Sequence, residues 1–169
     1  MKIAVAHLNQ TDRDTFVKLL GSIFEHSPWV AEAAYSKRPF GSLEHLHRVM
    51  CAAVSAAPRE RRLALILAHP DLAGKAALAG ELTEVSSREQ AGAGLDRLSP
   101  EDYARFHRLN DAYRRTFGFP FIIAVRGYTA TGILEEFERR LHHGTEDEER
   151  EALAQIERIA LFRLQDLIS

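Results

Sequence analysis

The sequence predicts an all-α fold, a compact single-domain bundle of about seven to nine helices. Apolar residues recur at the three- and four-residue spacing of amphipathic helices along most of the chain. Prolines and glycines interrupt this periodicity at intervals typical of helix ends. Only the segment 119–125 has the composition of a β-strand, and it has no second strand with which to pair.

The composition is that of one globular domain comprising residues 1–169. Apolar residues make up 46% and charged residues 27%, which excludes general disorder. A net charge of −2 gives no reason to expect nucleic acid as a partner, so a small-molecule substrate is favoured. No run reaches the roughly 18 apolar residues of a membrane span, and the single Cys51 permits no internal disulfide. We therefore expect a cytoplasmic protein with no membrane partner.

The first 40 residues predict two helices. Thr11, with Asp14 three residues later, is expected to cap a helix whose apolar stripe extends through 16–24. Ser27-Pro28 has the order of a cap followed by a first-turn residue. This second helix is expected to end before Pro39, because a residue that precedes proline avoids the helical region.

The next two predicted helices lead to a histidine. Ser42 is expected to cap the first of them, and Pro58 is expected to start the second. The run 63–68 is apolar on every side, which indicates a buried central helix, although a strand remains the alternative. Because Pro70 ends whatever precedes it, His69 is expected at an abrupt turn near the core.

A loop rich in glycine and alanine precedes a short helix predicted over 86–95. Ser99-Pro100 then begins a long helix, for which Gly118 is the natural left-handed end. The strand-like segment 119–125 follows, and we expect it to be buried extended chain.

Two further helices are predicted over 131–142 and 145–167, and a Thr145/Glu148 capping box opens the second. Arg163 falls on the apolar stripe of that helix, where an unpaired charge is costly. Its guanidinium must therefore meet either an internal carboxylate or a planar ligand.

Two other features depart from a purely structural pattern. His69 could be a hydrogen-bonded structural residue or a proton donor that titrates near neutrality. Ser86-x-x-Glu89-Gln90 has the spacing of a capping box, and the free amides of such a helix start could also hold a polar ligand. The remaining histidines show no spacing typical of metal ligands, so no metal site is predicted.

Seven blocks of the sequence, in order, carry a resemblance to a known family. They are 24–32, 38–40, 69–73, Ser86-x-x-Glu89-Gln90, Leu109-Asn110-x-x-Tyr113, 117–122 and Arg163-Leu164. Together they resemble the OHCU decarboxylase family over nearly the whole chain, where OHCU is 2-oxo-4-hydroxy-4-carboxy-5-ureidoimidazoline. Arg126 departs from the pattern, since many members carry a small residue at that position.

The resemblance implies an all-helical, commonly homodimeric enzyme that needs no cofactor. The implied reaction is decarboxylation of OHCU to S-allantoin, the third step of urate-to-allantoin conversion in purine catabolism. The implied catalytic residues are His69, as proton donor, and Glu89. The implied substrate-binding residues are Pro70, Ser86, Ser87, Arg88, Glu89, Gln90, Phe121, Ile122, Ile123, Ala124, Val125 and Arg163.

The implied chemistry needs no electron sink from the protein, because the C=N bond of the substrate ring can accept the electrons released with CO₂. We hypothesise that Arg163 and the backbone amides of 86–90 orient the ring. His69 would then protonate one face of the intermediate, and Glu89 would hold His69 or manage the substrate hydroxyl proton. Two alternatives remain open, a helical small-molecule-binding or scaffolding module without catalysis and a hydrolase acting on a ureide or amide.

Overall fold

The computed structural model describes residues 1–74 and 80–169, and these residues confirm the all-α prediction. Within them, one isolated bridge between Ile3 and Ile168 is the only strand-like pairing. The helices are α1 (Val5–Leu8), α2 (Arg13–Leu20), α3 (Trp29–Tyr35), α4 (Leu43–Ala56), α5 (Arg59–Leu67), α7 (Glu84–Gly92), α8 (Pro100–Phe117), α9 (Ala130–Arg140) and α10 (Thr145–Leu167). Part of the predicted loop rich in glycine and alanine, 75–79, lies outside the described residues.

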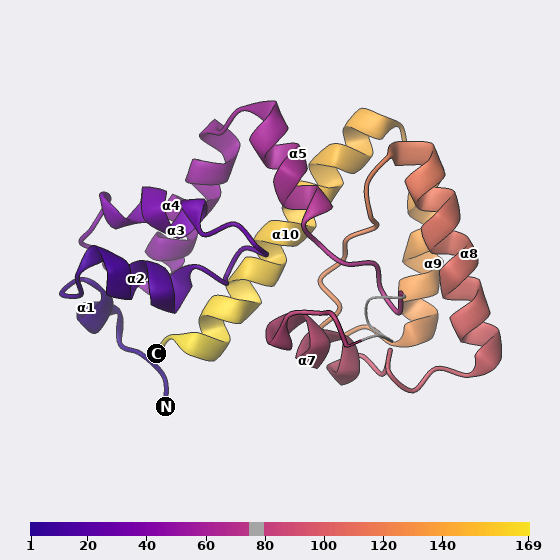
Figure 1. Cartoon of the computed structure of the whole chain (residues 1–169), viewed down its shortest axis with the longest axis horizontal. Helices are drawn as coiled ribbons and strands as arrows, with labels where there is room; N and C mark the ends of the chain where they lie inside the picture. Colours follow the sequence, from indigo (N-terminus) through magenta and orange to yellow (C-terminus); the bar gives the residue numbers. More distant parts are fainter. Residues whose placement is uncertain (75–79) are drawn as a thin grey trace. The chain divides into compact units, whose positions relative to one another are not determined.

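The chain forms two compact units (Figure 1). The first comprises Met1–Ala68 and Ile156–Ser169, and the second comprises His69–Gln155. Helix α10 contributes its first turns to the second unit and its last turns to the first. None of the described helices is both long and apolar enough to cross a membrane.

In the first unit, α3 packs against both α2 and α4. Arg38 ties the loop between α1 and α2 to the end of α3, because its Nη1 donates hydrogen bonds to the carbonyls of Leu8, Asn9 and Thr11. Its guanidinium also lies 3.7 Å from the ring centroid of Tyr35, a cation–π distance. The resemblance block 38–40 thus has a structural role in this unit.

The predicted cap of the first long helix is wrong by one residue. Asp12, not Thr11, caps α2, because its carboxylate accepts a hydrogen bond from the amide of Thr15. The Thr11 hydroxyl instead donates to the carbonyl of Leu8. The helix also ends at Leu20, so the buried end of the predicted stripe belongs to the following turn. Either oxygen could cap a helix, and the backbone conformation decided between them.

Two further expectations in this unit need correction, and one is confirmed. Ser27 does not cap α3, since its hydroxyl donates to the carbonyl of Glu25. The α5 segment is helical as predicted, but Leu67 is 48% exposed, so the run 63–68 is not buried on every side. Ser42 does cap α4, accepting a hydrogen bond from the amide of His45.

The second unit contains α7, α8, α9, the start of α10 and the extended chain between α8 and α9. As predicted, Ser99 caps α8, and Gly118 ends it in a left-handed conformation with φ 80°. Residues 119–125 form buried extended chain without helix or sheet, also as predicted. The ring of Phe121 stacks on that of Phe137 in α9, with 3.8 Å between centroids, which fixes the extended chain to the helical core.

Two predicted helix starts in this unit differ from the structure by one or two residues, whereas α10 begins at Thr145 as predicted but without its predicted capping box. Thr83 caps α7, because its hydroxyl accepts a hydrogen bond from the amide of Ser86. Thr129 caps α9 in the same way. At α10, the Glu148 carboxylate does not form the predicted capping box, since Tyr113, Arg140 and His143 bind it. The Glu148 side chain therefore binds residues of other segments instead of capping its own helix.

Candidate active site

His69 lies just after α5 and is 7% exposed, as predicted for a histidine at a turn near the core. Gln90 of α7 binds the backbone of the residues that follow His69. The Gln90 Oε1 accepts a hydrogen bond from the amide of Ala73 at 2.9 Å, and Nε2 donates to the carbonyl of Asp71 at 3.3 Å. One amide side chain therefore satisfies two backbone groups of the turn.

Helix α8 holds the same turn from a second element. Asn110 Nδ2 donates to the carbonyl of Leu72 at 2.8 Å, and Arg114 Nε contacts both carboxylate oxygens of Asp71 at 3.0 and 3.2 Å. These contacts support a left-handed backbone at Ala73, with φ 50°, a conformation that residues with a Cβ atom rarely adopt. The turn after His69 is thus fixed by side chains of α7 and α8.

One face of α7 carries the buried polar residues of the predicted site. Ser86 and Gln90 are 4% and 6% exposed, and Glu89 is half-buried beside them, as the three- and four-residue helical spacing requires. Ser87 and Arg88 are exposed. Gln90 is engaged with the turn, and Ser86 and Glu89 lie on the same side of the helix.

The hypothesis that the backbone amides of 86–90 bind a ligand is wrong. Thr83 takes the first two of these amides, that of Ser86 with its hydroxyl and that of Ser87 with its carbonyl. The amides of 88–90 fall within the helix, where they donate to carbonyls four residues earlier. The error follows from the cap, because Thr83 lies three residues before Ser86 and the amides of 86–90 are therefore engaged by the cap or by the helix itself.

Side chains of two helices hold the extended segment 121–125 by its backbone. The carbonyl of Ile122 accepts a hydrogen bond from Arg140 Nη1 at 2.6 Å, and the amide of Ala124 donates to Gln155 Oε1 at 3.0 Å. In a trans peptide unit the C=O and the N–H point in opposite directions, so the Ile123 N–H is opposite the carbonyl of Ile122 and the Ile123 C=O is opposite the amide of Ala124. The N–H and C=O of Ile123 therefore face away from these two partners.

Arg140 joins the extended segment to a buried carboxylate. Its Nε donates to Glu148 Oε1 at 2.7 Å, and the two side chains are 1% and 0% exposed. The guanidinium also lies 4.4 Å from the ring centroid of Phe121. Glu148 accepts two more hydrogen bonds, from the Tyr113 hydroxyl and from Nδ1 of His143, when that nitrogen carries its proton. Burial raises the pKa of Tyr113 well above its usual value, so the phenol remains a donor.

Arg140 and Glu148 were not predicted from the sequence, although one signal was available. Ile133, Phe137 and Arg140 follow the spacing of one helix face, and all three are buried. The same reasoning that singled out Arg163 would therefore have found Arg140. Glu148 gave no such signal, because it lies in a run of acidic residues at a helix start.

Arg163 belongs to the other unit, and its partner there is an internal carboxylate. Its side chain is 5% exposed, and Nη2 donates to Glu25 Oε2 at 2.8 Å. Nη1 donates to the carbonyls of Ser22 and Ile23, each at 3.3 Å. The periodicity argument for its burial is thus confirmed, and the predicted internal carboxylate is Glu25. Ligand binding by Arg163 stays a prediction.

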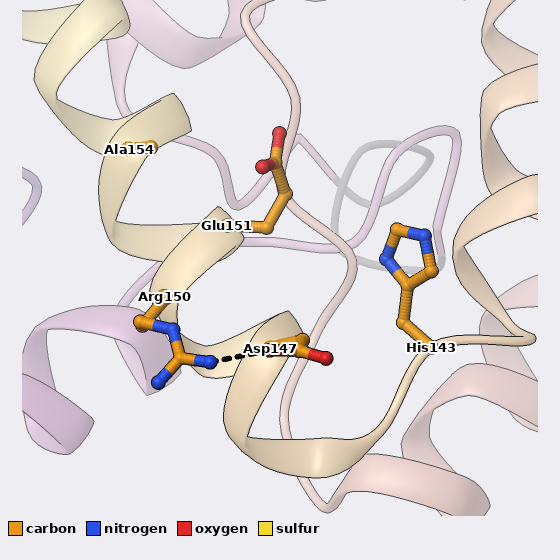
Figure 2. Close-up of a pocket in the computed structure, with 5 residues that line it drawn as sticks. All are labelled: His143, Asp147, Arg150, Glu151 and Ala154. Carbon is orange, nitrogen blue, oxygen red and sulfur yellow. Dashed lines mark hydrogen bonds and ion pairs between the residues drawn. The ribbon is translucent and has the colours of Figure 1, made fainter.

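The remaining predicted site residues all lie in the unit His69–Gln155. Arg126, which departs from the family pattern, is exposed rather than buried with 121–125. A hollow at the start of α10 is lined by other residues, namely His143, Asp147, Arg150, Glu151 and Ala154 (Figure 2). Among the described residues, no group of three or more His, Cys, Asp or Glu side chains could hold a metal ion.

The described residues define the class of protein as an all-helical one, with a buried histidine at a turn that side chains of α7 and α8 fix. The particular family follows from comparison with known proteins. The chain belongs to the OHCU decarboxylase family, whose family model matches residues 9–165.

Named relatives cover nearly the whole chain. A 2-oxo-4-hydroxy-4-carboxy-5-ureidoimidazoline decarboxylase of Haloferax volcanii is 44% identical over 168 residues, covering 99% of this chain and 98% of its own. The uric acid degradation bifunctional protein PucL of Bacillus subtilis is 47% identical over 162 residues, 96% of this chain but only 32% of its own.

Solved structures agree on the fold. A crystal structure of (S)-allantoin synthase matches with a TM-score of 0.80 and 32% identity, over 98% of this chain and 54% of that chain. A crystal structure of OHCU decarboxylase in the presence of (S)-allantoin has a TM-score of 0.70 over 92% of this chain and 97% of that chain. At 18% identity, this second match concerns the fold alone.

Proposed function

We propose that this protein decarboxylates OHCU to (S)-allantoin in the breakdown of urate. One observation carries the proposal: relatives named for this activity align with almost the entire chain, and the first of them covers 98% of its own length at 44% identity. The region matched by the family model, 9–165, spans the positions of all the predicted site residues.

In this proposal His69 is the proton donor. Its burial and the clamped turn support the role, because an acid that delivers a proton to one face of an intermediate must hold one position. Glu89, half-buried on the face of α7 that also carries Ser86 and Gln90, would orient His69 or manage the proton of the substrate hydroxyl.

The substrate would be held by side chains and by backbone. Ser86 offers a buried hydroxyl, and Ile123 offers a backbone N–H and C=O on the side away from Arg140 and Gln155. We also propose Pro70 and Arg163 as substrate-binding residues. Ser87 and Arg88 are proposed as well, although their exposure favours a smaller contribution to binding.

The proposed step needs no electron sink from the protein. The bond between the ring carbon and the carboxylate breaks, CO₂ leaves, and the electron pair moves into the adjoining C=N bond of the substrate as an ene-amine. The ring nitrogen takes up a proton as the pair arrives. The hydroxyl on the decarboxylated carbon then loses its proton and becomes a carbonyl, while His69 transfers a proton to one face of the neighbouring carbon that bears the ureido group, which makes a single enantiomer. The protein contributes orientation and proton control.

The wider setting is also part of the proposal. We infer that residues 1–169 act as one domain, that the protein is a homodimer, and that it works in the cytoplasm without a nucleic-acid partner. Size-exclusion chromatography with light scattering tests the dimer directly. A monomer at the concentrations used for turnover would contradict it.

The test generates OHCU in solution from urate with a uricase and the hydrolase of the following step. Addition of this protein is expected to produce an immediate near-UV circular dichroism signal of (S)-allantoin, whereas the spontaneous reaction gives a slow racemic product. A slow background that the protein leaves unchanged would overturn the proposed function and favour a binding module. Release of ammonia or cleaved ureide without CO₂ would favour a hydrolase.

Replacing His69 by Asn tests the assigned role of the histidine. We expect stereoselective turnover to be lost, by about 100-fold or more, because general acid catalysis contributes at least that much. The matched control is His142→Asn, since His142 is exposed and far along the chain from the turn. Turnover at the wild-type rate in His69→Asn would remove His69 from the mechanism.

A further inference from the structure

Gln155, on the first turns of α10, contacts the extended segment and a second side chain at the same time. It is 8% exposed, and its Oε1 accepts the hydrogen bond from the amide of Ala124 at 3.0 Å. At the other end of the same amide, Nε2 donates to Glu151 Oε1 at 2.9 Å. Glu151 lies one helical turn earlier, at the wall of the surface hollow in Figure 2.

The orientation of this amide matters because its two ends are not equivalent. A side-chain amide presents an acceptor at one end and a donor at the other. If the group were reversed, its NH₂ would face the N–H of Ala124, and a buried donor would lose its acceptor. A carboxylate accepts hydrogen bonds and cannot donate them when ionised, so Glu151 selects the orientation in which Oε1 faces Ala124.

The amide of Ala124, which Gln155 holds, directly follows Ile123, whose own N–H and C=O face the opposite side of the chain. Arg140 holds the carbonyl of Ile122, and Gln155 holds the amide of Ala124. These two anchors flank Ile123 and fix the peptide planes on both sides of it. A rotation at either plane would redirect the Ile123 N–H and C=O.

We propose that Gln155 and Glu151 are positioning residues for the ligand-facing backbone of Ile123. Gln155 sets the peptide plane through Ala124, and Glu151 acts through Gln155 by fixing its amide orientation. Neither side chain touches the substrate. The inference rests on the proposed function, in which the segment 121–125 contacts the substrate.

Three variants separate this role from a general contribution to stability. Glu151→Gln keeps an oxygen that can accept from Gln155, whereas Glu151→Ala removes the acceptor. Gln155→Leu removes the anchor itself. Glu146→Ala is the matched control, because Glu146 is an exposed acid in the first turn of the same helix. Thermal unfolding of each variant shows that the fold is retained.

The first readout is the ¹H–¹⁵N spectrum of the protein. The amide signals of Ala124 and Ile123 are expected to shift in Glu151→Ala and Gln155→Leu and to stay near wild type in Glu151→Gln and Glu146→Ala. Hydrogen exchange at Ala124 should accelerate about tenfold in Glu151→Ala, as expected for one weakened hydrogen bond. Wild-type signals and exchange at both amides in Glu151→Ala would overturn the inference.

The second readout is turnover. For Glu151→Ala we expect KM for OHCU to rise about tenfold or kcat to fall by a similar factor, with rescue in Glu151→Gln. Equal KM and kcat in all four variants would overturn the inference even if the amide signals moved. Failure of the proposed function is distinguishable, since it appears as no turnover by the wild-type protein, whereas the amide readout needs no turnover.

Discussion

The buried pair of Arg140 and Glu148 allows a stability prediction with a worked magnitude. The perturbation is Glu148→Leu, which removes the carboxylate and leaves the guanidinium at a position that is 1% exposed. Arg140 would keep its hydrogen bond to the carbonyl of Ile122 and its contact with Phe121, but neither neutralises a full charge. Leaving one member of a buried pair unpaired costs about 3–5 kcal/mol.

This free energy translates into a large shift of the melting temperature. For chains of this size, 1 kcal/mol lowers Tm by about 2–4 °C, so Glu148→Leu should lower Tm by roughly 6–20 °C. Glu148→Gln keeps an acceptor oxygen for Arg140 and Tyr113 and should fall between Glu148→Leu and wild type. The double variant Arg140→Met with Glu148→Leu should recover most of the loss, because a buried ion pair replaced by apolar groups is often neutral in stability.

The assay is urea unfolding of the four proteins of this cycle, followed by far-UV circular dichroism, which gives the coupling energy of the pair. The control is Glu136→Gln, since Glu136 pairs with Arg139 at the surface, where the side chains are 30% and 54% exposed. That variant should change the free energy of unfolding by less than about 1 kcal/mol. The reasoning is refuted if Glu148→Leu is as mild as Glu136→Gln, or if the double variant is as unstable as the sum of its single changes.

Three further predictions follow from other parts of the structure. Gln90→Leu leaves the amide of Ala73 and the carbonyl of Asp71 without their partner, so the free energy of unfolding should fall by about 2–4 kcal/mol and turnover should fall as well. Unchanged turnover in the folded variant would show that the turn after His69 does not depend on Gln90. Glu25→Gln removes the negative charge beside buried Arg163 and should lower the free energy of unfolding by about 3 kcal/mol in a urea titration; a change below about 0.5 kcal/mol would contradict the pairing. Burial raises the pKa of Cys51 to about 12, so its thiolate fraction at pH 8 should be about 1,000-fold lower in the folded protein than in urea. The rate of its reaction with a disulfide reagent should be lower by the same factor and should rise with pH. Equal rates in the folded and unfolded states would disprove the shift.

Short-range signals predicted most of the helices. Ser42, Ser99 and Gly118 act where the pattern predicted, because a cap depends on side chains and backbone within one turn. The predictions failed where two cap residues were close together, as at Thr11 and Asp12. Both oxygens satisfy the local rule, but Asp12 accepts the hydrogen bond from the amide of Thr15, while the Thr11 hydroxyl donates to the carbonyl of Leu8.

The candidate site was predictable in part. Periodicity alone placed Arg163 in the core, and the abrupt end of an apolar run placed His69 at a buried turn. The hypothesis about the amides of 86–90 failed with the cap on which it depended. Gln90 has the right spacing for a ligand-facing helix residue, yet its amide is used to hold the turn after His69, which no local pattern indicates.

The sequence by itself determined the helical periodicity, the helix ends with unambiguous caps and the burial of Arg163, because each depends on residues within a few turns of one another. Only the tertiary structure decided the partners of the buried polar groups. Arg163 meets Glu25, which lies 138 residues away, and Asn110 meets the carbonyl of Leu72, 38 residues away. A buried charge or amide requires some partner, but packing of distant segments determines which one lies within hydrogen-bond distance.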